Sequence, residues 1–90
     1  MALHAAGTHP TLAQAFQFVF DACAAQFPNA TQNDKIGKMY PLQSQRADFA
    51  SDVVQNSKNA GFKMDPGKVP TGDSDTLQTV AVAVTTNAVA

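Results

Sequence analysis

The C-terminal segment Thr76–Thr86 constrains the fold more than any other part of the chain. It is rich in β-branched residues, and its valines alternate with alanines. In an extended chain, Val80, Val82 and Val84 would share one face, with the alanines on the other. The segment therefore predicts a β-strand over about 76–86.

A strand of this length has no obvious partner elsewhere in the sequence. Eleven residues at roughly 3.3 Å each extend about 36 Å. An edge without lysine, proline or a bulge is prone to uncontrolled pairing. We therefore expect the segment to pair with a strand of another chain. A helix, a strand within the chain's own small sheet and an unstructured tail are the alternatives.

Charge is confined to the middle of the chain. Residues 1–20 and 76–90 contain no charged side chain, whereas residues 31–75 hold all six cations and six of the seven aspartates. The formal net charge is −1, which argues against nucleic-acid specificity and an anionic membrane as partners. Since charge normally covers a free surface, the uncharged ends suggest contact with other protein chains.

The first helix is predicted over about 12–26. Thr11 and Gln14 form the capping-box pattern at its start, and Pro28 ends it. Phe18 lies off the apolar stripe, which suggests a contact with another subunit. The stripe itself has helical spacing and consists of Leu12, Phe16, Val19, Phe20, Cys23 and Phe27.

A second helix is predicted over about 45–60. Ser44 is the expected N-cap, and Gly61 suits the position after the helix, where a positive φ is common. Residues 1–10 form an expected N-terminal arm that contains Gly7 and Pro10. The predicted protomer core combines residues from both helices and the loops: Phe16, Phe20, Phe27, Phe49, Val53 and Phe62.

The whole chain, residues 1–90, is predicted to be a single small α+β domain. It has a helical core with loops over 11–75, and residues 76–90 form a C-terminal strand or arm. A mainly α chain with extended arms is the alternative. No apolar stretch approaches the roughly 20 residues that span a bilayer.

The sequence predicts no catalytic residue, metal site or cofactor. His4 and His9 are the only histidines, and Cys23 falls on the apolar stripe, where a buried, inert thiol is expected. Whether Asp65, Asp73 and Asp75 bind an ion such as calcium stays open. Lys35, Lys38 and Arg46 form a small predicted basic patch near Tyr40, which suits local contact with a phosphate only.

These features favour a non-enzymatic structural or assembly subunit held by contacts between chains. Small size, neutral ends and low charge suggest a virion protein, such as a bacteriophage capsid-stabilising, decoration or head–tail junction subunit. An accessory subunit of a large cellular complex, located in the cytoplasm, and a monomeric regulatory binding domain are the alternatives. The residues expected in contact with other chains are Leu3, Phe18, Leu77, Val80, Val82 and Val84.

Overall fold

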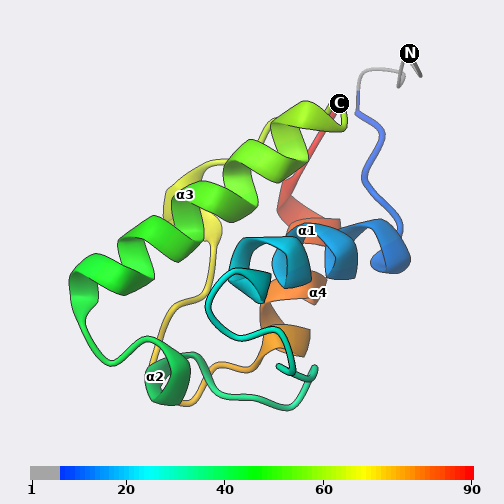
Figure 1. Cartoon of the computed structure of the whole chain (residues 1–90). Coiled ribbons are helices and arrows are strands. Elements are labelled where there is room, and N and C mark those ends of the chain that lie inside the picture. The colour runs from blue at the N-terminus through cyan, green and yellow to red at the C-terminus, as the bar shows by residue number, and fades with distance from the viewer. Residues whose placement is uncertain (1–6) are drawn as a thin grey trace.

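The predicted C-terminal strand is a helix. A computed structural model describes residues 7–90, and no β-strand occurs within them (Figure 1). Two isolated antiparallel β-bridges occur in the described residues, one between Lys35 and Thr76 and one between Lys63 and Val89. The elements in chain order are α1 (Leu12–Ala24), α2 (Ile36–Met39), α3 (Gln43–Asn59), the 3-10 turn η1 (Pro66–Lys68) and α4 (Leu77–Asn87).

Helix α4 forms because its apolar residues also fit a helical period. Leu77, Val80, Ala81 and Val84 are all fully buried, which is the i, i+3, i+4, i+7 pattern of one helix face. Thr76 caps the helix by accepting a hydrogen bond from the Thr79 amide at 3.2 Å. A strand would have placed Val82 with Val80 and Val84, but Val82 is 47% exposed.

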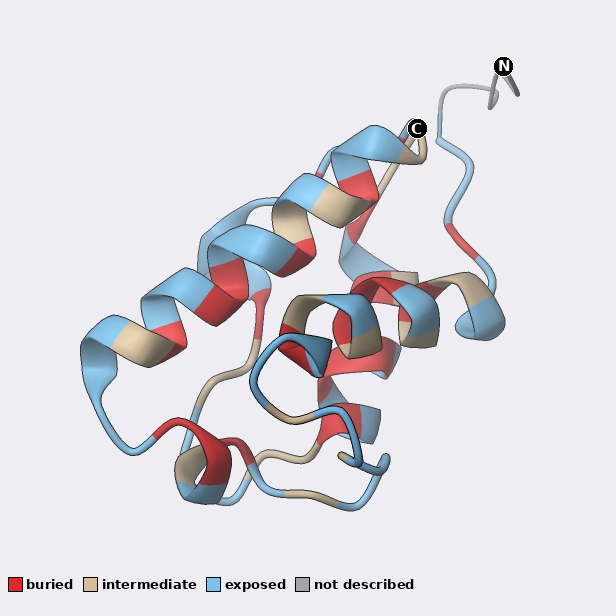
Figure 2. Cartoon of the chain, viewed as in Figure 1, coloured by how far each residue is buried: buried red, intermediate tan, exposed pale blue. Residues whose placement is uncertain are grey.

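The α+β prediction is therefore wrong, and so is the C-terminal strand or arm over 76–90. Helix α4 crosses α1 and packs against it, and α1 also packs against α3, so α1 lies at the centre of the fold. Figure 2 shows the buried residues on the sides of these helices that face one another. The chain is mainly helical, and α4 contributes to the hydrophobic core of the same chain.

Helix α1 begins where the sequence predicts. The Gln14 amide donates to the Thr11 hydroxyl at 3.1 Å, and the Thr11 amide donates to the Gln14 side chain at 2.9 Å, which completes the capping box. The helix ends at Ala24, two residues before the predicted end, and the amides of Gln26 and Phe27 beyond it both donate to the Cys23 carbonyl.

The buried face of α1 differs from the predicted stripe. Phe18 is only 7% exposed and packs on Phe62, with ring centroids 6.2 Å apart. Its expected contact with another subunit is therefore replaced by a contact inside the chain. Leu12, Phe16 and Phe20 lie along the edge of the buried face, which consists of Ala15, Phe18, Val19 and Cys23.

Helix α3 starts two residues before the prediction. Leu42 is its N-cap, and the Leu42 amide donates to the Gln45 side chain at 3.0 Å, so Ser44 lies inside the helix. Gly61 follows the helix with φ at +95°, as expected. This turn lets the Phe62 amide donate to the Ser57 carbonyl at 2.9 Å and brings the Phe62 ring into the core.

The two ends of the described chain lie side by side. The ring Nδ1 of His9 donates to the Ala88 carbonyl at 2.7 Å, and the Ala90 amide donates to the Thr8 carbonyl at 2.8 Å. Lys63 and Val89 exchange two backbone hydrogen bonds of 2.7 and 2.9 Å. Residues 7–10 of the predicted N-terminal arm thus lie against the C-terminus, while the remainder of that arm is outside the described residues.

Alanine substitutions along α4 distinguish a helix from a strand. Val80→Ala or Val84→Ala should lower the free energy of unfolding by about 2–3 kcal/mol, because each removes buried methyl groups. Val82→Ala should change it by less than about 0.5 kcal/mol, since Val82 faces solvent. Urea unfolding of the three variants measures this. Equal losses at all three positions would contradict the helix.

Candidate binding site

Five of the six residues predicted to contact other chains lie in the described region, and four of these are inside the protein. Leu77, Val80 and Val84 are fully buried in α4, and Phe18 is buried in α1. Only Val82 is on the surface, while Leu3 lies outside the described residues. These positions are therefore not brought together on an accessible face.

The predicted core is largely recovered. Phe49, Val53 and Phe62 are buried, whereas Phe16, Phe20 and Phe27 are partly buried and pack against the core. These three phenylalanines lie on or just after α1. Their side chains are half-buried.

The aspartates of the candidate ion site are held in separate loop contacts. Asp65 and Asp75 each accept a backbone hydrogen bond, from Gly67 and Gly72 respectively, both at 2.8 Å. Asp73 accepts from Arg46 at 2.5 Å. Within residues 7–90 no group of three or more histidine, cysteine or acidic side chains is arranged to hold a metal ion.

Cys23 is buried, as expected, and its thiol donates to the Phe20 carbonyl at 3.5 Å. Burial is the main reason that the pKa of this thiol is raised, which keeps it in the unreactive protonated form. His9 is used in the contact with Ala88, and His4 is outside the described residues.

Contrary to the prediction, Arg46 is not part of a surface basic patch with Lys35 and Lys38. Its side chain is buried, where Nε donates to the Tyr40 carbonyl at 2.7 Å and the guanidinium pairs with Asp73. This contact ties the start of α3 to the loop before α4. Lys35 and Lys38 are the two cations that remain on the surface near Tyr40.

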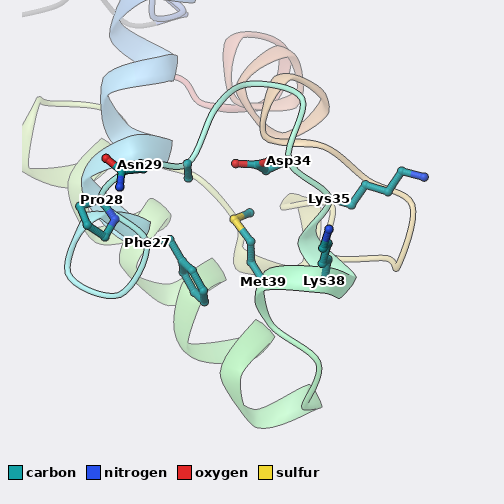
Figure 3. Close-up of a pocket in the computed structure, with 8 residues that line it drawn as sticks. Phe27, Pro28, Asn29, Asp34, Lys35, Lys38 and Met39 are labelled. Carbon is teal, nitrogen blue, oxygen red and sulfur yellow. The ribbon is translucent and has the colours of Figure 1, made fainter.

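The two lysines line a cavity at the surface of the described chain. It has a volume of about 430 Å³ and opens between α2 and the loop that follows α1 (Figure 3). Its apolar part comes from Phe27, Pro28, Ala30 and Met39, and Asn29, Asp34, Lys35 and Lys38 supply its polar groups.

Backbone hydrogen bonds position both walls of this cavity. The Thr31 amide donates to Asp34 Oδ2 at 2.6 Å, which closes the loop after α1. The amides of Ile36 and Leu77 donate to the carbonyls of Asp75 and Asp34, at 2.7 and 3.1 Å. Helix α2 is thereby fixed to the segment that enters α4, and the cavity depends on contacts between residues about forty positions apart.

A smaller cavity adjoins this site and shares Phe27, Pro28 and Ala30 with it. It has a volume of about 190 Å³ and is lined by Phe20, Cys23, Phe27 and neighbouring residues of the loop. We call Leu12, Phe16 and Phe20 the α1 stripe. Leu12 is 45% exposed, and the rings of Phe16 and Phe20 are stacked, with centroids 5.6 Å apart.

Tyr40 packs against Phe27 of the cavity lining, and its hydroxyl is buried without a hydrogen-bond partner among the described residues. Its ring packs edge-on against Phe27, with a centroid distance of 5.2 Å, and also against Phe49, at 4.8 Å. Burial, the largest cause, raises the pKa of the phenol far above its usual value near 10.

Comparison with known proteins gives no relative for this chain: no family model, curated protein or solved structure matches it. Among residues 7–90, no helix has the length and apolar character needed to cross a membrane.

Gly37 is required where α2 meets the loop before α4. A Cβ at this position would lie 2.6 Å from the Asp73 Cα, which is a backbone atom that cannot move freely. Gly37→Ala should therefore destabilise the protein by about 1–3 kcal/mol, although alanine favours a helix. Gly67→Ala, whose Cβ would approach only the Asp65 side chain at 3.2 Å, is the control for thermal unfolding. Stabilisation by Gly37→Ala would contradict this packing.

Tyr40→Phe should stabilise the protein by about 1 kcal/mol at neutral pH, because it removes a buried hydroxyl without a partner. The raised pKa also predicts a pH effect: above about pH 10 the unfolded state loses the phenol proton first, so stability falls as pH rises. The variant should show a smaller alkaline fall in urea unfolding. A loss of stability at neutral pH would show that the hydroxyl does have a partner.

Proposed function

We propose that this protein is a non-enzymatic subunit that works by contact between its own copies through the α1 stripe. The observation that carries the proposal is the uncharged apolar edge of α1, where Leu12 is 45% exposed and Phe16 and Phe20 are partly buried. The proposal keeps the class predicted from the sequence and replaces strand pairing by a helix contact. The spacing of these residues and the low charge of α1 support this proposal.

The stripe suits a symmetric contact. Its residues recur every four positions, so they form a line along the helix that two antiparallel copies of α1 would match. A two-fold contact places each charged side chain near the same side chain of the second copy. The charged residue of α1 is Asp21, which lies on another side of the helix, where its carboxylate accepts a hydrogen bond from Gln17 at 2.7 Å. Self-contact through the stripe therefore meets little repulsion.

One such contact is weak. Three partly exposed side chains bury on the order of 300 Å² per copy, which is below the roughly 800 Å² per partner of stable complexes. A contact of this size becomes useful where many copies are held together, because each contact then adds to the others. This is the regime of an assembly subunit.

The side chains that could act in catalysis are buried or held in structural hydrogen bonds, which supports a non-enzymatic role. Cys23 is buried, His9 holds the C-terminus, and the loop aspartates accept structural hydrogen bonds. A virion location, and membership of a large cellular complex, stay predictions that rest on size and on the distribution of charge along the sequence.

A monomeric binding domain is the second candidate function. The buried apolar face of α4 supports it, since the C-terminal segment needs no second chain to satisfy its backbone. The cavity of about 430 Å³ beside α2 also supports it, because that volume lies in the range of small-molecule sites. The two candidates differ in their dependence on concentration.

Sedimentation velocity across about 10 µM to 1 mM tests the proposal, since weak pair contacts fall in this range. The wild-type sedimentation coefficient should rise with concentration, and Leu12→Gln should remove that rise by placing an amide in the stripe. Val82→Gln is the matched control, because Val82 is exposed to nearly the same extent on α4.

Both variants should keep the wild-type circular dichroism and unfold within about 0.5 kcal/mol of the parent, as expected for exposed positions. A wild-type protein that stays monomeric throughout the range would overturn the assembly proposal and leave the binding domain. An equal effect of both variants would show that the contact does not run through the α1 stripe.

A further inference from the structure

The cavity beside α2 combines an apolar floor with charges of opposite sign at its rim. In Figure 3, Phe27 lies to the left of Met39, and the Asp34 carboxylate lies above both and points to the left. The Lys38 side chain rises from α2 to the right of Met39 in this view, whereas the Lys35 side chain extends to the right, away from the other labelled residues. The site is thus divided into an apolar part and a part with one anion and one cation.

These two charges do not neutralise each other. Arg46 with Asp73 is the sole ion pair found within residues 7–90, so Asp34 and Lys38 line one cavity without forming a direct pair. Space between two opposite charges suits a ligand that bears both complementary charges. A simple anion would be repelled by Asp34, and a simple cation by Lys38.

Asp34 is held in position for such a contact. Its Oδ2 accepts from the Thr31 amide at 2.6 Å, and its backbone carbonyl accepts from the Leu77 amide at 3.1 Å. The other carboxylate oxygen, Oδ1, is left to accept from a ligand. A fixed carboxylate loses little freedom on binding, while the long Lys38 side chain can adjust to the ligand.

From this arrangement we propose that the cavity binds a free α-amino acid with an apolar side chain. The ammonium group of the ligand donates to Asp34 Oδ1, and its carboxylate accepts from Lys38 Nζ. The side chain packs on Phe27 and Met39. This site is separate from the α1 stripe, so it stands whether or not the protein forms assemblies.

The test is a titration of the full ¹⁵N-labelled chain with L-phenylalanine, followed by amide chemical shifts. Saturable shifts should be centred on residues 27–39. Glycine lacks the apolar group, N-acetyl-L-phenylalanine lacks the ammonium, and L-phenylalaninamide lacks the carboxylate. Each of these should bind at least about fivefold more weakly, which is the effect expected for one partly exposed charge contact or one apolar contact.

Variants separate the roles of the two charges. Asp34→Asn keeps a side-chain oxygen for the Thr31 amide but removes the charge, and Lys38→Gln removes the cation. Each should weaken L-phenylalanine binding about fivefold, with the spectrum of the free protein otherwise retained. Lys35→Gln is the matched control: it removes a lysine from the same rim, but one whose side chain points away in Figure 3.

Three outcomes would overturn the proposal. The first is the absence of saturable shifts with L-phenylalanine up to its solubility limit. The second is equal binding of N-acetyl-L-phenylalanine, which would make the cavity an anion site, or of L-phenylalaninamide, which would make it a cation site. The third is an equal effect of Lys35→Gln and Lys38→Gln.

Discussion

The burial of α4 against α1 is the contact on which the rest of the structure depends. Leu77, Val80, Ala81 and Val84 have no exposed surface, and together they fill the side of α1 that α3 does not cover. Two helices and several loops would leave this side open to water. A fully buried valine or leucine contributes about 1.5–3 kcal/mol, so α4 supplies a large part of the stability of a small domain.

The entry into α4 also builds the candidate site. Segment 73–78 provides backbone partners for residues 32–37, and Arg46 joins the same segment to the start of α3. The loop after α1 then closes over α2, and the cavity forms between them. Packing and binding geometry are therefore linked: a change that loosens the entry into α4 also moves Asp34 relative to Phe27.

Local signals in the sequence were sufficient to place α1 and most of α3. Thr11 with Gln14, Pro28 and Gly61 act on their immediate neighbours, and such signals do not depend on the remainder of the fold. Phe18 and the valines of α4 were misplaced for a different reason. Val80 and Val84 share a face both in a β-strand, which has a period of two residues, and in an α-helix, which has a period of 3.6 residues. The burial of Leu77 and Ala81 against α1 favours the helix. The cavity could not be predicted at all, because contacts between distant segments create it.

The position of α4 also bears on how the chain reaches its native state. The core cannot close until residues 77–88 are available to α1, and the hydrogen bonds of His9 with Ala88 and of Ala90 with Thr8 join points some eighty residues apart. During synthesis, α1 must wait with its apolar side exposed until residues 77–88 have left the ribosome. Folding is therefore expected to be slower than in a bundle of sequential helices, and the nascent chain passes through a stage at which a chaperone can bind it.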